Sequence, residues 1–428
     1  MTRITATYDL ESPIGVAAAA AVVAGEQSTG TFTRLAAETD ALRARSAARI
    51  EDIVITGTSP TPALPTRKTG TSYERGRVTL SWSLDNFGTS LPVLMSTLAG
   101  NLFELAELSA IRLIDMQLPG AFATAHPGPQ FGAQGTRDLM GGHTGPLIGT
   151  IIKPSVGLGP DETAALVATL VDAGIDFIKD DELQANGPHC PFAERVAAVS
   201  AVLNAHADKT GKKVIYAFNV TDEIDQMWRN LDLLQAHGGT CAMVCVSAVG
   251  LSGLRALRDR SPMAIHGHRA GWGIYSRSPD IGISFGVMQK LWRLAGADHL
   301  HVNGLANKFT ETDAVIAQSA RSVQQPVCAS GPAHLAMPVY SSGQTVWQVD
   351  PARRLLNNDD FIFCAGGGIL SHPFGASAGV MALRQAAQAA RDGIDIRAFA
   401  RQHPELEAAI NTFPEPDIAV TQGQNRAS

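Results

Sequence analysis

The stretch Gly174-Ile175-Asp176-Phe177-Ile178-Lys179-Asp180-Asp181-Glu182 is a short apolar strand that runs directly into one lysine and three carboxylates. Three neighbouring acids repel one another, so they need a basic partner or a bound cation. Asp181 and Glu182 offer adjacent oxygen ligands of the kind that Mg²⁺ prefers. A lysine that is desolvated in such a cluster loses its proton more easily and can react as an amine. A solvated loop with a local ion pair explains the Lys-Asp-Asp-Glu run alone equally well.

The same rhythm of apolar strand, polar loop and helix continues along the chain from Leu147 onwards. The expected strands are 147–152, 175–179, 213–219, 242–247, 263–268, 298–302, 338–341 and 361–365. The expected helices are 161–173, 191–207, 222–236, 251–258, 283–294, 311–322, 346–356 and 376–391. Eight strands alternating with eight helices predict an α/β protein with a (β/α)₈ TIM barrel. A doubly wound open sheet accounts less readily for eight such regular units.

In a barrel of this kind the chemistry lies at the C-terminal ends of the strands. Six expected strands end in polar side chains or glycines: Lys153; Lys179, Asp181 and Glu182; His266, His268 and Arg269; His299, His301 and Asn303; Ser341, Ser342 and Gly343; Gly366, Gly367 and Gly368. His301 is nearer its strand end than His299, so we expect His301 to face the site and His299 to be structural. We expect Asp180 to point away from the site and to pair with backbone or a basic neighbour.

Residues 1–125 have a different organisation and predict a ferredoxin-like α+β domain. Its expected strands are 5–8, 29–33, 76–84 and 110–116, and its expected helices are 14–25 and 91–105. A linker rich in Gly and Pro, 119–142, leads into the catalytic barrel, which is expected over 126–412. The polar residues 413–428 are expected to form a frayed tail.

The composition excludes several classes of function. The chain has 428 residues, a net charge of -6 and 6% aromatic residues, so neither a basic surface for nucleic acid nor a base-stacking surface is expected. The apolar run 14–25 is too short to cross a membrane, and no basic leader precedes it. The five cysteines are scattered without a CxxC pair, which is typical of reduced thiols in a cytoplasmic protein.

Several of these motifs, taken in order, resemble the large subunit of ribulose-bisphosphate carboxylase/oxygenase (RuBisCO). The motifs are Gly149-Thr150-Ile151-Ile152-Lys153-Pro154, Lys179-Asp180-Asp181-Glu182, His266-Gly267-His268-Arg269, Asp298-His299-Leu300-His301, Lys308, Ser341-Ser342-Gly343 and Gly366-Gly367-Gly368. In the first domain, Glu26-Gln27-Ser28-Thr29-Gly30-Thr31 and Gly100-Asn101 also resemble segments of this family. The resemblance covers nearly the whole chain.

The resemblance implies a role for each matching residue. Lys153 matches the base that removes a proton beside a ketone, His268 lies near the substrate hydroxyls, and Lys308 is carried on a mobile loop. The metal site would bind Mg²⁺ through Asp181, Glu182 and Lys179, the last after carbamylation by CO₂. The residues implied in binding substrate and its phosphate are Arg269, His301, Ser341, Gly343, Gly366 and Gly367. Glu26 and Asn101 match residues that reach a neighbouring subunit, which implies a homodimer with active sites at the subunit interface. No small subunit is expected.

The departures from the family pattern indicate a different substrate. Ser155 stands where the carboxylase has a second lysine, Asn307 and Ser342 replace glycines, and Trp272 replaces a histidine. The acidic residue expected two positions after Lys308 is absent. These changes argue against ribulose 1,5-bisphosphate and resemble the fourth, RuBisCO-like form of the family.

Within that form, the sequences of the motifs are most similar to those of a branch from non-photosynthetic bacteria that acts in sugar-acid catabolism. The implied enzyme would form an enediolate from 3-oxo-isoapionate 4-phosphate, transfer its carboxyl group and hydrolyse a C–C bond to give 3-phosphoglycerate and glycolate. The main alternative is an enolase or isomerase of a methylthio-ketose phosphate in methionine salvage. True bisphosphate carboxylation and a non-catalytic regulatory role are less favoured, because Ser155 and Ser342 disfavour the first and the complete base and metal set disfavours the second.

Overall fold

The computed structural model describes residues 2–30 and 35–419. These residues belong to two compact units. The first unit comprises Met1–Pro127, Gly271–Ala295 and Pro326–His334, and the second comprises Gly128–Ala270, Gly296–Gln325 and Leu335–Ser428. In the described ranges, no helix combines the length and apolar character needed to cross a bilayer.

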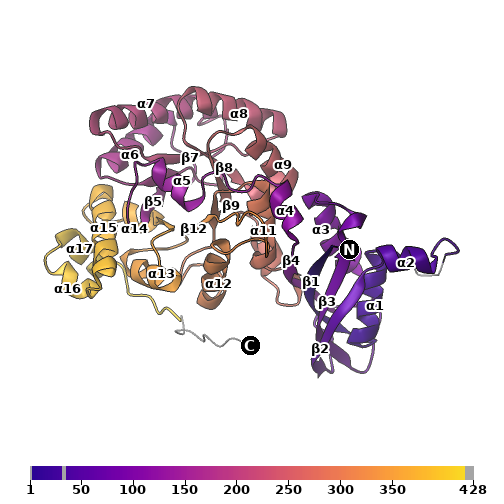
Figure 1. Ribbon diagram of the computed structural model, residues 1–428. Coiled ribbons are helices and arrows are strands. Elements are labelled where there is room, and N and C mark those ends of the chain that lie inside the picture. Colours follow the sequence, from indigo (N-terminus) through magenta and orange to yellow (C-terminus); the bar gives the residue numbers. More distant parts are fainter. Residues whose placement is uncertain (1, 31–34, 420–428) are drawn as a thin grey trace. The chain divides into compact units, whose positions relative to one another are not determined.

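The first unit is a five-stranded mixed sheet with helices, which confirms the predicted α+β class (Figure 1). The strand order is β10-β4-β1-β3-β2, in which β10 joins β4 in parallel and the other pairs are antiparallel. Its strands are β1 (Arg3–Ser12), β2 (Arg49–Ser59), β3 (Tyr73–Ser83), β4 (Ala110–Gln117) and β10 (Ile281–Ile283). Its helices are α1 (Val16–Glu26), α2 (Asp40–Ser46), η1 (Leu84–Asn86), α3 (Leu91–Ala99), η2 (Asn101–Glu104), α4 (Gly120–Ala125), α10 (Gly273–Ser276) and α11 (Phe285–Ala295).

In the described residues, the second strand along the chain is β2, a segment that the sequence interpretation did not predict as a strand. The expected strand 29–33 falls mostly on residues that the structure does not describe. Residues 31–33 lie outside the described residues, and Thr29 and Gly30 are not in a strand. β2 is largely exposed and its pairing with β3 shifts register at two places. A register shift interrupts the alternation of apolar and polar residues, so the period-two signal of a half-buried strand is missing from this segment.

The second unit contains a closed barrel of eight parallel strands, as the sequence predicts (Figure 1). The strands are β5 (Leu147–Ile151), β6 (Phe177–Lys179), β7 (Ile215–Asn219), β8 (Cys241–Cys245), β9 (Ala264–His268), β11 (His299–His301), β12 (Met337–Tyr340) and β13 (Ile362–Cys364). Its helices are α5 (Gly132–Asp138), α6 (Pro160–Asp172), α7 (Phe192–Thr210), α8 (Ile224–Ala236), α9 (Val246–Arg260), α12 (Asp313–Val323), η3 (Val346–Gln348), α13 (Val349–Leu356), α14 (Gly366–Leu370), α15 (Ala376–Asp392), α16 (Ile396–Ala400) and α17 (Pro404–Thr412). Strands buried on both faces are near-continuous apolar runs, which is why the sequence located them well.

Asp298 ties together the end of the barrel where the strands begin. Its carboxylate accepts hydrogen bonds from the backbone N–H groups of Phe131 (2.6 Å), Gly132 (3.1 Å) and Ile265 (2.8 Å), and from Arg258 (3.0 Å). The side chains of Asp298 and Arg258 are 0% and 2% exposed. This buried ion pair holds the N-terminal ends of the strands in place. The polar side chains of the candidate site lie at the opposite, C-terminal ends.

Candidate active site

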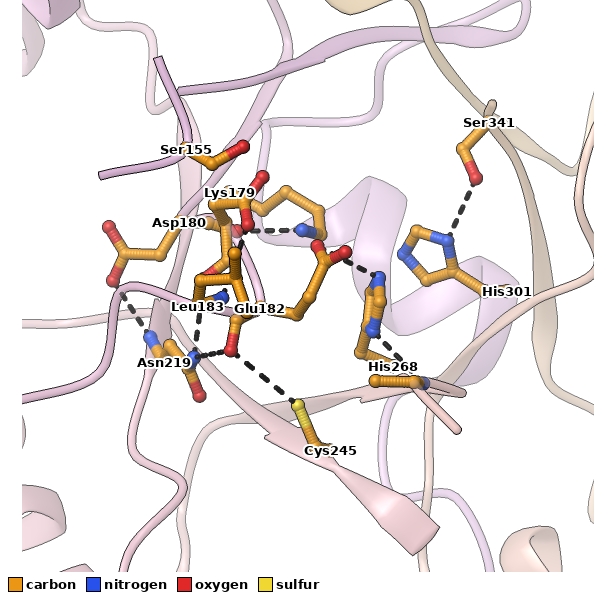
Figure 2. Close-up of polar contacts among 12 residues, drawn as sticks. Ser155, Lys179, Asp180, Glu182, Leu183, Asn219, Cys245, His268, His301 and Ser341 are labelled. Carbon is orange, nitrogen blue, oxygen red and sulfur yellow. Dashed lines mark hydrogen bonds and ion pairs between the residues drawn. The ribbon is translucent and has the colours of Figure 1, made fainter. Parts of the chain in front are cut away.

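The Lys-Asp-Asp-Glu run leaves the C-terminal end of β6, at the rim where the barrel rule expects chemistry. Lys179 is fully buried, and its ammonium donates to the backbone oxygen of Asp180 at 2.6 Å (Figure 2). Burial lowers the pKa of Lys179, and the carboxylates of Glu182 and Asp181 only partly oppose that shift. The amine is therefore closer to its reactive, neutral form than a surface lysine is.

Asp180 points away from the other acids, which confirms the prediction for this residue. Its carboxylate accepts hydrogen bonds from the Tyr216 hydroxyl (2.6 Å), the Asn219 backbone N–H (2.8 Å) and the buried Arg195 guanidinium (3.2 Å). One of the three charges is thus neutralised below the rim, and only Asp181 and Glu182 remain for the site.

Asn219, the last residue of β7, holds the backbone of the acidic run. Its side-chain amide donates to the backbone oxygens of Asp181 and Glu182, both at 3.2 Å (Figure 2). The sequence interpretation missed this residue. Applying the strand-end rule to the expected strand 213–219 would have found it, because Asn219 is the polar residue at that end.

Lys153 reaches the same acids from the end of β5. Its ammonium lies 2.5 Å from an Asp181 carboxylate oxygen and 2.8 Å from the Ser155 hydroxyl, and its side chain is 42% exposed. Burial opposes ionisation of Asp181, but hydrogen bonds from Lys153 and the Leu183 N–H outweigh it and lower the Asp181 pKa. The structure therefore brings Lys153, Lys179 and Asp181 together from two neighbouring strands.

The imidazole of His268 extends the cluster from β9. Its Nε2 lies 3.5 Å from a Glu182 carboxylate oxygen (Figure 2). Burial is the largest cause that lowers the pKa of His268 far below its ordinary value, and the positive charges of Lys179, Arg269 and Lys153 add to it. His268 is therefore a neutral hydrogen-bonding group at neutral pH.

A chain of hydrogen bonds links β9, β11 and β12 beside His268. His301 Nε2 lies 2.7 Å from His266 Nε2, and His301 Nδ1 lies 3.0 Å from the Ser341 hydroxyl. His299 is turned elsewhere, and its Nε2 meets the Thr136 hydroxyl at 2.8 Å. His301 lies beside His268, with ring centres 4.4 Å apart, whereas His299 contacts Thr136 of α5.

Arg269 follows β9 and is buried against Glu311. One guanidinium nitrogen lies 3.3 Å from a Glu311 carboxylate oxygen, and a second nitrogen contacts the other oxygen more closely. The sequence interpretation did not select Glu311. The two residues are 42 positions apart, so only the fold reveals the pair.

Lys308 and the glycines implied in phosphate binding lie on the loops after β11, β12 and β13. Lys308 is exposed, and its ammonium lies 5.2 Å from the ring centre of its neighbour Phe309. A Cβ atom placed on Gly343 would come no closer than 4.0 Å to the backbone nitrogen of Lys308, and one placed on Gly367 would meet nothing within 4 Å. Gly366 is similarly open, its closest contact being Ile151 at 3.8 Å. The space beside these three glycines is therefore open, which is what the approach of an anion to their backbone would need.

In the first unit, Glu26 and Asn101 are paired with each other. The Asn101 side-chain amide donates to the Glu26 carboxylate at 3.3 Å, and both residues are exposed. Trp272 is packed in the same unit against Trp292 and Phe285, with ring centres 5.7 and 5.8 Å apart.

Comparisons with known proteins identify the family. The catalytic-domain family of the ribulose bisphosphate carboxylase large chain matches residues 132–413, and the family of its N-terminal domain matches residues 2–122. The chain belongs to the RuBisCO large-chain family. It is 51% identical over 408 residues to a protein of Xanthobacter autotrophicus named 3-oxo-isoapionate-4-phosphate transcarboxylase/hydrolase, covering 95% of this chain and 98% of that one. It is also 42% identical to a Rhizobium etli protein named 3-oxo-isoapionate-4-phosphate decarboxylase, covering 96% of this chain and 99% of that one.

A solved structure supports the same assignment. The crystal structure of a RuBisCO-like protein from Burkholderia fungorum has a TM-score of 0.91 and 40% identity, and covers 96% of this chain and 100% of that one. The agreement extends over both units, so the RuBisCO-like fold holds for the whole described chain.

Within this RuBisCO-like site, the donors around Lys179 suit a hard cation only in part. In residues 2–30 and 35–419, no group of three or more His, Cys, Asp and Glu side chains is arranged to hold a metal ion. Asp181 and Glu182 supply oxygen ligands beside Lys179, whose cationic form is not a ligand. A third oxygen ligand from these neighbours therefore requires that Lys179 be modified, and its burial and lowered pKa fit such a reaction.

Proposed function

We propose that this RuBisCO-like protein is a Mg²⁺-dependent enzyme that forms an enediolate from a phosphorylated keto sugar acid, 3-oxo-isoapionate 4-phosphate. The products would be 3-phosphoglycerate and glycolate. The observation that carries the proposal is the cluster of Lys153, Lys179, Asp181, Glu182 and His268 at one barrel rim. The 51% identity to the Xanthobacter transcarboxylase/hydrolase supports the choice of substrate.

The residues that would hold Mg²⁺ are Asp181, Glu182 and Lys179, the last as the carbamate formed from its neutral amine and CO₂. The bound cation would stabilise negative charge on the substrate oxygens. Asn219 fixes the backbone that carries both carboxylates, so their oxygens would be oriented before the cation arrives.

In the proposed reaction, Lys153 takes a proton from the carbon beside the ketone, and His268, as a neutral imidazole, hydrogen-bonds a substrate hydroxyl. The enediolate carbon then bonds to the carboxyl carbon as the bond to the carbon that carried it breaks, while Lys308 holds the carboxylate charge. The electron pair left on that donor carbon is taken up as an enolate of the neighbouring ketone, which regains the proton held by Lys153. Water adds to the ketone, the adjacent C–C bond breaks, and the released carbanion is protonated. One substrate molecule and one water thus yield two acids.

The active form is proposed to be a homodimer in which Glu26 and Asn101 serve the partner's site. The loops after β5, β6 and β11 and the segment after α14 carry large apolar side chains that are more than half exposed, namely Val156, Leu183, Phe309 and Phe374. Such apolar side chains around the rim favour burial against another protein surface. Glu26 and Asn101 are both exposed, as a contribution to a second subunit requires.

A second candidate is decarboxylation of the same substrate, favoured by the 42% identity to the Rhizobium etli decarboxylase. The two reactions share the enediolate and differ in whether the carboxyl group is transferred or released as CO₂. In the transcarboxylase reaction, the carboxyl group must stay in the site between leaving one carbon and bonding to the other. Its retention therefore depends on the groups that hold it, including Lys308.

An NMR assay with Mg²⁺ and bicarbonate tests the proposal on the wild type and on Lys179→Ala. Formation of 3-phosphoglycerate and glycolate by the wild type alone is the expected result. Release of CO₂ with a ketose phosphate one carbon shorter would select the decarboxylase. Inactivity on this substrate, together with proton–deuterium exchange on a methylthio-ketose phosphate, would overturn the proposal in favour of an enolase or isomerase.

A further inference from the structure

The guanidinium of Arg269 forms an ion pair with a carboxylate of the protein itself, that of Glu311. Both Glu311 carboxylate oxygens contact it, each through a different guanidinium nitrogen. The Arg269 and Glu311 side chains are only 5% and 13% exposed. A two-point contact matches the fork of the guanidinium and is the geometry with which arginine binds phosphates and carboxylates. Glu311 thus sits where a ligand anion would bind Arg269.

Neighbouring side chains hold Glu311 in this position. The Asn303 amide donates to the same carboxylate at 2.7 Å, and the Ser342 hydroxyl donates to Asn303 at 3.3 Å. The Asn307 amide donates to the backbone oxygen of Glu311 at 3.2 Å. Asn303, Asn307 and Ser342 therefore all belong to one network that fixes the carboxylate, and two of them, Asn307 and Ser342, are departures from the RuBisCO pattern.

The positive charge at this end of the site is balanced. Burial lowers the pKa of His301 far below its ordinary value, and the positive charges of Lys179 and Arg269 add to this shift. His301 is therefore uncharged at neutral pH. The charge of Arg269 is matched by Glu311, and an incoming phosphate would meet a fixed negative charge of its own sign.

We infer that Glu311 is a specificity-determining residue that closes the Arg269 anion site and restricts the enzyme to substrates with a single phosphate. The inference rests on the proposed function and deepens it. The one phosphate then binds at the other end, where the space beside Gly343, Gly366 and Gly367 is open. Arg269, expected from the family resemblance to bind phosphate, instead serves as the partner of Glu311.

Calorimetric titration with ribulose 1,5-bisphosphate and ribulose 5-phosphate, in the presence of Mg²⁺ and bicarbonate, tests this inference without any turnover. The wild type is expected to bind the bisphosphate no more tightly than the monophosphate. Glu311→Gln should tighten bisphosphate binding at least about tenfold while changing monophosphate binding less than about threefold. Glu407→Gln, on α17, removes the same charge away from the site and should behave as the wild type.

The double variant Glu311→Gln/Arg269→Gln should not bind the bisphosphate more tightly than the wild type. The tighter binding expected of Glu311→Gln requires the guanidinium of Arg269 that the substitution releases. Glu311→Ala serves as the second single variant, and thermal unfolding checks that each variant is folded. An unchanged ratio of the two affinities in both Glu311 variants, weaker bisphosphate binding, or binding of neither ligand would overturn the inference. This test and the test of the proposed function can fail separately. If the Glu311 variants shift the ratio of bisphosphate to monophosphate affinity but the wild type does not turn over the keto sugar acid, only the proposed function is refuted.

Discussion

Replacing Asn219 by Ala should weaken Mg²⁺ binding with a moderate loss of stability. The variant removes two hydrogen bonds of 3.2 Å to the Asp181 and Glu182 backbone oxygens, and a third of 3.2 Å from the Thr221 N–H to the Asn219 side chain. At about 1 kcal/mol each, the loss in the free energy of unfolding is about 2–3 kcal/mol. Residues that orient metal ligands typically change metal affinity or activity by about 10–100-fold, so the Mg²⁺ concentration for half-maximal turnover should rise by that factor.

The assay is a Mg²⁺ titration of product formation at saturating bicarbonate, with urea denaturation run in parallel. Asn230→Ala is the matched control, because Asn230 is a buried residue of α8 whose side chain accepts a hydrogen bond from Gln226 at 2.8 Å. The control should lose stability without a change in its Mg²⁺ requirement. If the two variants show the same Mg²⁺ dependence, Asn219 does not orient the ligands and the reasoning is refuted.

Three further outcomes are expected. Asp298→Ala leaves the Arg258 charge buried and three N–H groups without their acceptor, so urea denaturation should show a loss of about 3–5 kcal/mol. Burial lowers the pKa of His299 to about 3, so below about pH 6.5 the unfolded chain takes up a proton that the folded chain excludes. The free energy of unfolding should therefore fall by up to about 1.4 kcal/mol per pH unit between about pH 6.5 and 3. In denaturation at pH 7, 6 and 5, His299→Gln should lose less stability per pH unit than the wild type. Equal slopes of stability against pH would contradict this. Lys308→Met should reduce carboxyl transfer by about 10²-fold while deuterium exchange beside the ketone stays within a few-fold, and equal losses would place Lys308 in proton transfer instead.

The sequence predicted the barrel well because most of its strands are buried apolar runs that end in polar residues. It located Lys153 and the 179–182 run on neighbouring strands, and the fold then brings Lys153 within 2.5 Å of Asp181. It did not predict β2, whose exposed faces and register shifts carry no periodic signal. It also missed Glu311, because a partner 42 residues away is set by the packing of two loops and leaves no local pattern.

The three adjacent acids of the opening stretch are tolerated because each has a different environment. Asp180 is neutralised by Arg195 below the rim, and Asp181 is paired with Lys153. Glu182 faces His268, whose lowered pKa leaves it uncharged, so this carboxylate lacks a full counter-charge from the imidazole.

Carbamylation of Lys179 would replace a cation by an anion at the centre of this cluster. Counting the carbamate, Asp181 and Glu182 as negative and Lys153 as positive leaves an excess of two negative charges, since Arg195 and Asp180 cancel. A divalent cation balances this excess, whereas a monovalent cation leaves one buried charge uncompensated. With the proposed carbamate in place, the charges surrounding Lys179 would therefore fit a divalent cation by their sum as well as by their oxygen chemistry.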